Sequence, residues 1–117
     1  MSPRKWRHRI KDILQAISKI ETYAHGMDLA SFENDPKTID AVIRNLIIIG
    51  EAASHLPEEV TQANPEIPWR LMADMRNFAV HEYWGVELSI VWETIVNDMP
   101  PLVARLEDVL KRTQGEP

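Results

Sequence analysis

The chain has 117 residues, contains no cysteine, and carries 13 Lys and Arg against 18 Asp and Glu, which gives a formal net charge of −5. This length suits one domain with one core, so we expect a single domain over residues 1–117 with a frayed tail from about residue 113. Without cysteine, the chain can form neither a disulfide nor a thiolate zinc site. Its longest apolar run, residues 46–49, is far shorter than the roughly 20 residues that span a bilayer. We therefore expect a cytoplasmic protein without a membrane segment.

The charge is distributed unevenly along the chain. Residues 1–11 contain five basic residues and no acidic one, which leaves 8 basic and 18 acidic residues for the rest. General nucleic-acid binders are usually basic, so a polyanion must be bound locally. We interpret the basic segment from Arg4 to Lys11 as a solvated helix start, and as the one positive cluster in the sequence it is also a candidate phosphate contact to be tested.

Apolar residues recur with the three- and four-residue spacing of helices almost throughout the chain. The first predicted helix covers residues 6–24, and Gly26 is expected to end it. A polar loop over residues 31–36 follows. Asp35 is predicted to cap the second helix, with Pro36 in its first turn, because proline lacks the amide that a helix start cannot use.

The predicted second helix, residues 37–56, is apolar over more than one face. Its main apolar stripe consists of Ile39, Val42, Ile43, Leu46, Ile49 and Ala53. Ile47 and Ile48 widen this stripe, so the helix is either the centre of a monomeric bundle or partly covered by a second subunit, which we favour. Gly50 in so apolar a helix costs about 1 kcal/mol relative to alanine, which indicates close helix packing at that point.

The second half of the chain continues the helical pattern. Residues 57–68, which contain three prolines, are predicted to form a connection to a third helix over residues 68–81. A fourth helix is predicted over residues 88–98, and the two prolines at 100–101 open a fifth. Since no strand pair or internal repeat is found, the predicted fold class is all-α, a four- or five-helix bundle.

The third predicted helix separates its residues onto two faces at about 100° per residue. The expected core face consists of Leu71, Met72, Met75, Phe78 and Ala79. The opposite face consists of Arg76, Asn77, Val80, His81 and Tyr83. This second face is either the ordinary solvated side of an amphipathic helix or a chemical site that offers a cation, an amide, an imidazole and a phenol.

Arg76 and His81 have the chemistry that phosphodiester cleavage without a metal requires. A guanidinium binds phosphate bidentately and stays charged, while an imidazole gives or takes a proton near neutral pH. With RNA, the substrate's own 2′-hydroxyl can be the nucleophile. We therefore expect His81 to act as general acid or base and Arg76 to stabilise charge on the phosphoryl oxygens.

Residues 76–83 match the R-x4-H-x-Y motif of the HEPN superfamily, and the chain resembles the HepT toxins of HepT/MNT (type VII) toxin–antitoxin systems. The similarity includes the segment Ile48-Ile49-Gly50-Glu51-Ala52-Ala53 and three later segments, residues 65–69, 90–92 and 97–102. It covers about residues 6–112, almost the whole chain.

The resemblance implies a helical homodimer in which two copies of the motif meet across a composite cleft. It also implies a metal-independent endoribonuclease that needs no cofactor, acts on cellular RNA, and has Arg76 and His81 as the catalytic pair. The implied partner is an MNT nucleotidyltransferase, which neutralises such toxins by transferring AMP from ATP to the motif tyrosine, here Tyr83.

Two further residues are candidates for supporting roles. Asn77 lies one helical turn from His81 and could fix its tautomer or bind a phosphate oxygen, unless it is a surface or capping residue. Glu51 belongs to a polar stripe of the second helix and could orient Arg76 or His81, unless the stripe is only a solvated or ion-paired face. No metal site is predicted, because His8 and Asp12 offer only two ligands.

Two other readings of the chain stay open. It could be a non-catalytic nucleotide- or RNA-binding partner subunit that presents a substrate to the nucleotidyltransferase. It could also be a structural helical bundle in which the motif is accidental.

Overall fold

A computed structural model describes residues 3–77 and 88–114 of the protein. The predicted all-α fold is confirmed, since the described residues form helices and turns with no strand among them. The elements in chain order are α1 (Pro3–Ala24), α2 (Leu29–Glu33), α3 (Pro36–Ser54), α4 (Glu58–Ala63), α5 (Trp69–Asp74), α7 (Leu88–Glu93), the π-helical turn η1 (Thr94–Asp98) and α8 (Met99–Arg112).

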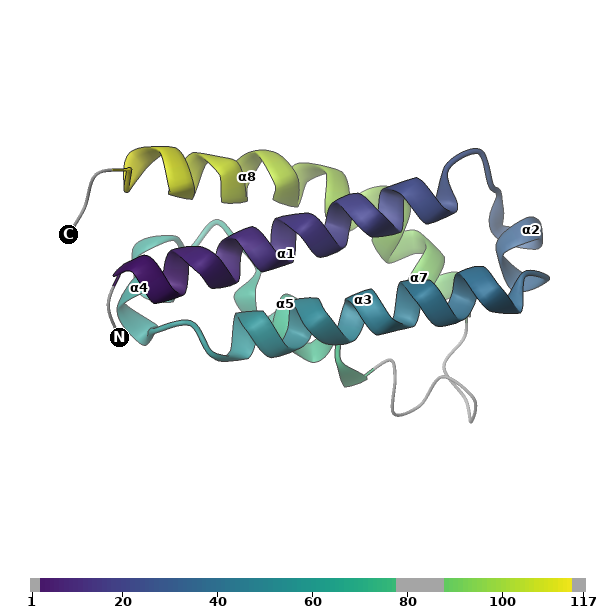
Figure 1. The fold of residues 1–117 in the computed structure, drawn as a ribbon, viewed down its shortest axis with the longest axis horizontal. Coiled ribbons are helices and arrows are strands. Elements are labelled where there is room, and N and C mark those ends of the chain that lie inside the picture. The colour runs from purple at the N-terminus through teal and green to yellow at the C-terminus, as the bar shows by residue number, and fades with distance from the viewer. Residues whose placement is uncertain (1–2, 78–87, 115–117) are drawn as a thin grey trace.

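The two longest helices, α1 and α3, lie side by side and antiparallel at the centre of the bundle (Figure 1). Helix α8 packs along α1, and α5 packs against α3. Buried branched side chains at three- and four-residue spacing fill the contact between the central helices, namely Ile10, Ile13, Ile17 and Ile20 of α1 and Val42, Leu46 and Ile49 of α3. The periodicity read from the sequence is therefore the periodicity of the core.

The predicted signals for the ends of the first two helices are confirmed. Helix α1 ends at Ala24, and Gly26 follows with φ +77°, a conformation that glycine adopts without strain. Asp35 caps α3, because its Oδ1 accepts a hydrogen bond of 3.1 Å from the Thr38 amide, and Pro36 occupies the first turn. The helix ends at Ser54, two residues before the predicted end.

Two segments that were predicted to be connections contain short helices. Helix α2 lies where a polar loop was expected and begins with a capping box in which Asp28 and Ser31 each accept from the other's amide, at 2.9 and 3.0 Å. The buried ring of Phe32 packs against Trp92 of α7, with 5.2 Å between the ring centroids. Helix α4 similarly interrupts the 57–68 connection and buries Val60. Both helices therefore fix an apolar side chain to the core.

The predicted break between a fourth and a fifth helix is wrong, because α7, η1 and α8 form one uninterrupted helical run from Leu88 to Arg112. The two prolines at 100–101 lie in the first turn of α8. A proline inside a regular α-helix clashes with the carbonyl four residues earlier. Here the wider π turn comes directly before the prolines, with the Met99 amide bonded to the Thr94 carbonyl, so the chain continues as a helix.

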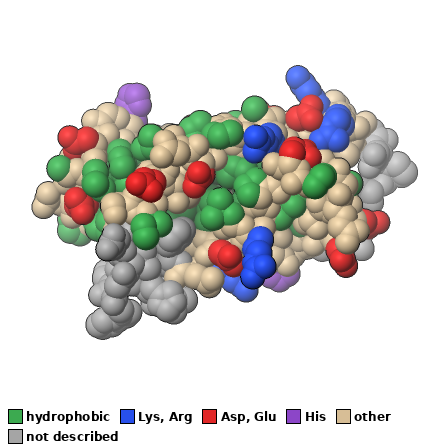
Figure 2. Space-filling view, turned by 180° about the vertical axis from the view of Figure 1, so that it is seen from behind, with side chains coloured by type: hydrophobic (Ala, Val, Ile, Leu, Met, Phe, Trp, Pro, Cys, Tyr) green, Lys and Arg blue, Asp and Glu red, His purple; other side chains and the backbone are tan. Residues whose placement is uncertain are grey.

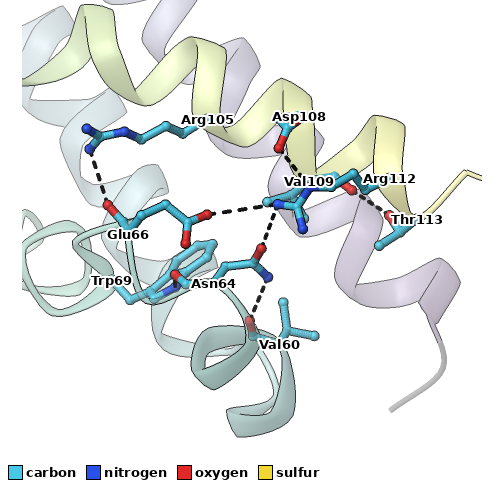
Figure 3. A network of polar contacts seen from close by, with 9 residues as sticks. All are labelled: Val60, Asn64, Glu66, Trp69, Arg105, Asp108, Val109, Arg112 and Thr113. Atoms are coloured by element: carbon cyan, nitrogen blue, oxygen red, sulfur yellow. Dashed lines mark hydrogen bonds and ion pairs between the residues drawn. The ribbon is translucent and has the colours of Figure 1, made fainter.

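A network of polar contacts connects the segment between α4 and α5 to α8 (Figure 3). At its centre the buried Asn64 donates from Nδ2 to the Val60 carbonyl over 2.9 Å and accepts at Oδ1 from Arg112 Nη2 over 2.8 Å. The Trp69 indole donates to the Asn64 carbonyl over 2.9 Å, and Arg112 Nε also donates to Asp108 Oδ2 over 2.7 Å. The start of α5, which leads to the candidate site, is thereby fixed to the opposite side of the bundle.

The extra apolar face predicted for the second helix lies partly on the surface. Ile47 of α3 is 37% exposed, and Ile48 is half-buried against the core. None of the helices in the described part of the chain combines the length and the hydropathy that crossing a membrane requires.

Candidate functional site

Arg76 lies two residues after the end of helix α5 and is exposed on the surface of the bundle, as predicted. The third helix was expected to continue over residues 68–81, whereas α5 ends at Asp74 and residues 75 and 76 form a turn. The cause is local: the Met75 amide bonds to the carbonyl of Met72, three residues back, over 3.1 Å, which tightens the final turn. His81, Tyr83 and the rest of residues 78–87 lie outside the described residues.

For those residues of the two predicted faces that the structure describes, the prediction holds with one exception. Met72 and Met75 are fully buried, and Arg76 and Asn77 are exposed. Leu71 was placed on the core face but is 40% exposed. It lies at the edge of the predicted apolar arc, and α5 buries only a narrow stripe, so its side chain remains at the surface.

Gly50 of α3 brings the backbone before Arg76 into direct contact with the central helix. A Cβ atom at Gly50 would lie 2.6 Å from the Arg76 amide nitrogen, 2.7 Å from the Arg76 Cβ and 3.0 Å from the Ala73 carbonyl oxygen. The close packing predicted from this glycine is therefore confirmed.

The guanidinium of Arg76 lies over the last turn of α3. Its Nη1 is 3.4 Å from Glu51 Oε1 and 3.4 Å from Ser54 Oγ. The two charged side chains are 46% and 53% exposed, so water screens this ion pair and its contribution to stability is small. Glu51, predicted as a supporting residue, is thus brought next to Arg76. Ser54 was missed, although its spacing of three residues from Glu51 on a helix could have identified it.

His55 belongs to the same end of α3. Its Nδ1 lies 2.7 Å from the Glu51 carbonyl, which also accepts from Ser54 Oγ over 3.0 Å. Since a carbonyl only accepts hydrogen bonds, the Nδ1 of His55 is the donor in this contact. These bonds satisfy a carbonyl at a helix end and hold the residues around Arg76 in place.

Positive charge is dispersed on the face of the molecule that Figure 2 shows, where Lys and Arg side chains stand beside Asp and Glu side chains. Some side chains of the basic N-terminal segment contact other helices, and others are exposed. Arg7 Nη1 donates to the Leu110 carbonyl over 2.8 Å and to the Thr113 hydroxyl, while Lys5 and Lys11 are exposed. Arg7 therefore fixes α1 to the end of α8 and is not available as a free phosphate contact.

No group of three or more His, Asp or Glu side chains within residues 3–77 and 88–114 is arranged to hold a metal ion. The described part of the site instead offers a half-exposed guanidinium with a carboxylate and a hydroxyl oxygen each 3.4 Å from its Nη1. A guanidinium is the side chain best suited to bind an oxyanion such as phosphate. The fold and the site together define a small all-helical protein that exposes a guanidinium beside a carboxylate at its surface.

Comparison with known proteins identifies a family within this class. The family model described as "Ribonuclease HepT-like" matches residues 13–109. The chain therefore belongs to the HepT-like ribonuclease family, as its sequence resemblance indicated.

Individual relatives agree with the family match. The chain is 40% identical to a "Probable ribonuclease HepT" of Thermococcus cleftensis over 92% of this chain and 98% of that protein. It is 36% identical to a "Putative RNase" of Methanocaldococcus jannaschii over 90% of this chain and 87% of the relative. A "Putative RNase" of Caldanaerobacter subterraneus is 35% identical over 91% of this chain and 95% of its own length. No solved structure matches the chain.

Proposed function

We propose that the protein is the toxin of a type VII toxin–antitoxin system and cleaves cellular RNA without a metal ion. The observation that carries the proposal is the match of the HepT-like ribonuclease family to residues 13–109, a range that includes both Arg76 and His81. The half-exposed guanidinium of Arg76 supports it, because a phosphate in solution can reach this group.

In the proposed reaction the 2′-hydroxyl of RNA attacks the adjacent phosphorus. The bond from the 2′-oxygen to phosphorus forms while the bond from phosphorus to the 5′-oxygen breaks. One His81 imidazole takes the proton of the 2′-hydroxyl, and a second copy, from the other subunit of a homodimer, protonates the leaving 5′-oxygen. Arg76 balances the negative charge that develops on the phosphoryl oxygens. The products are a 2′,3′-cyclic phosphate and a 5′-hydroxyl.

The test is cleavage of RNA by purified wild-type, Arg76→Ala and His81→Ala proteins in the presence of a chelator. We expect the wild type to cleave and both variants to lose at least about a hundredfold in rate. Arg105→Ala and His8→Ala are matched controls at exposed positions and should retain activity. A substrate with deoxyribose at the cleaved position should resist. Cleavage by His81→Ala, or a requirement for added metal, would contradict this mechanism, and binding without cleavage would favour the non-catalytic partner subunit.

The homodimer is part of the proposal. Ile47 on the outer face of α3 supports it, because a branched apolar side chain with 37% exposure next to the Arg76 contact is a reasonable interface residue. Sedimentation of the wild type should give a dimer, and Ile47→Glu should give a monomer with reduced activity. Ile90→Glu, a change at an even more exposed apolar residue of α7, is the control.

AMPylation of Tyr83 by an MNT-type nucleotidyltransferase is the proposed mode of neutralisation. AMP would add bulk and a negative phosphodiester at a site that receives phosphate, and would thereby exclude RNA. Intact-mass analysis after co-expression with the transferase should show a gain of whole AMP units. The chain has two tyrosines, so Tyr23→Phe is a matched control that should keep the modification, whereas Tyr83→Phe should abolish it.

A further inference from the structure

Three residues near the C-terminal end of helix α3 contact Arg76. Gly50 contacts its backbone, and Glu51 and Ser54 contact its side chain. These residues lie 22 to 26 positions away from Arg76 in the sequence, so only the fold brings them together.

The contact at Gly50 positions the backbone of Arg76, from which the side chain extends. The space between Gly50 and the Arg76 amide is too small for one methyl group, because a Cβ would lie 2.6 Å from that nitrogen. The backbone at Arg76 therefore packs directly against α3, and the arginine side chain extends from this contact.

Glu51 and Ser54 both bind the same guanidinium nitrogen. Ser54 Oγ donates its proton to the Glu51 carbonyl over 3.0 Å, so its oxygen is free to accept from Arg76 Nη1. The Glu51 carboxylate accepts from the same Nη1. A guanidinium has a second edge, formed by Nε and Nη2, which carries donors in the fork geometry that a phosphate requires. None of the contacts with α3 uses that edge.

We propose that Glu51 and Ser54 are positioning residues, which hold Arg76 by Nη1 so that its Nε–Nη2 edge points outward to bind the phosphate of the substrate. The inference rests on the proposed function of Arg76 as the phosphate-binding group. An arginine held in one orientation loses little side-chain freedom when the phosphate arrives, and this favours the transition state.

The first experiment does not depend on ribonuclease activity. Side-chain NMR measures the rotation of the guanidinium Nη groups, and Arg76→Lys identifies the signals of Arg76. We expect rotation in the wild type to be slower than in Glu51→Ala and Ser54→Ala, and equal to that in Asp108→Ala. Asp108→Ala is a matched control, since it removes a carboxylate that pairs with an exposed arginine on α8. Equal rotation in the wild type and Glu51→Ala would overturn the proposal.

The second experiment measures steady-state cleavage of RNA by the same proteins. Loss of positioning should lower kcat by about tenfold in Glu51→Ala and leave KM within about twofold, because misorientation of a catalytic group affects the transition state more than binding. Glu51→Gln, which keeps an acceptor oxygen, should recover part of kcat. Ser18→Ala, at an exposed serine of α1, is the control for Ser54→Ala.

Two outcomes separate this inference from the proposed function. In an Arg76→Lys background, Glu51→Ala should cause little further loss, and a full additional loss of tenfold would contradict a role through Arg76. If wild type and Arg76→Ala cleave RNA equally, the proposed function fails, whereas the NMR comparison still decides whether α3 orients the guanidinium.

Discussion

Gly50 and Arg76 touch through their backbones: a Cβ on Gly50 would lie 2.6 Å from the Arg76 amide nitrogen and 3.0 Å from the Ala73 carbonyl oxygen. Both neighbours are backbone atoms, which cannot rotate away as the end of a flexible side chain can. The candidate site is therefore connected to the central helix at the point where the arginine leaves the chain.

Gly50→Ala should consequently destabilise the protein and displace Arg76. We expect a loss of about 1–3 kcal/mol in the free energy of unfolding, the usual range for overpacking, together with loss of the proposed ribonuclease activity. Urea denaturation measures the first and RNA cleavage the second. Unchanged stability would show that α5 can move away from α3 at little cost.

Gly26→Ala is an informative contrast. Space is open around Gly26, but its φ of +77° is unfavourable for alanine. We expect a loss of about 1–2 kcal/mol from backbone strain, with ribonuclease activity retained. The two glycines are thus needed for different reasons, one for close approach and the other for its backbone angle.

Asn64→Ala should be costly because this buried amide joins two parts of the bundle. The substitution removes the bonds to the Val60 carbonyl and to Arg112, and we expect a loss of about 1–3 kcal/mol in the free energy of unfolding. Asn34→Ala is the matched control, since Asn34 Nδ2 makes the same bond to a carbonyl four residues earlier, but at an exposed position. A control effect as large as that of Asn64→Ala would contradict a special role for the network.

Phe32→Ala should show that α2 belongs to the core. The ring is fully buried and lies 5.2 Å from Trp92 between centroids. Removing a buried aromatic side chain typically costs about 3–5 kcal/mol. Tyr23→Ala, at a tyrosine that is 40% exposed, should cost distinctly less. A small loss at Phe32, measured by urea denaturation, would mean that α2 detaches easily.

The stability of the protein should fall in acid partly through Asp35. Hydrogen bonds from the Thr38 amide and then from its hydroxyl hold the pKa of this carboxyl below its ordinary value of 3.8. A group with a lowered pKa in the folded state stabilises the fold above its unfolded pKa, and the effect is lost as the pH falls through the folded value. The difference in Tm between wild type and Asp35→Asn should therefore shrink below about pH 4. A constant difference down to about pH 2 would contradict this assignment.

The sequence predicted those features that depend on local chemistry. The cap at Asp35, the stop at Gly26 and the close approach at Gly50 each follow from one residue's backbone or side chain. The helical periodicity of α1 and α3 likewise reproduces the core. Such signals are readable because they need no knowledge of the rest of the fold.

Features that depend on tertiary contacts were missed. The contact of Phe32 with Trp92, which lies 60 residues later, stabilises helix α2. The helix has only five residues, which is too short for the apolar spacing of a helix to be recognised. Leu71 was assigned to the core because periodicity does not reveal how wide a stripe a neighbouring helix covers. The contact of Ser54 with Arg76 also required coordinates, because the spacing from Glu51 places Ser54 on the same helix face but does not show what packs against that face.

The π turn η1 determines how α8 is rotated about the helix axis relative to α7. Val91, Ile95 and Met99 are all buried although each is four residues from the next, and in a regular α-helix two such steps would rotate a side chain by about 80° from its starting direction. The wider turn cancels much of this rotation. Deleting one residue from Thr94–Asp98 would leave an ordinary α-helix in which Val91 and Met99 are seven residues apart, and seven steps of about 100° again bring both side chains to one face. This segment should therefore tolerate the loss of one residue better than the gain of one, which would turn the two helical segments away from each other.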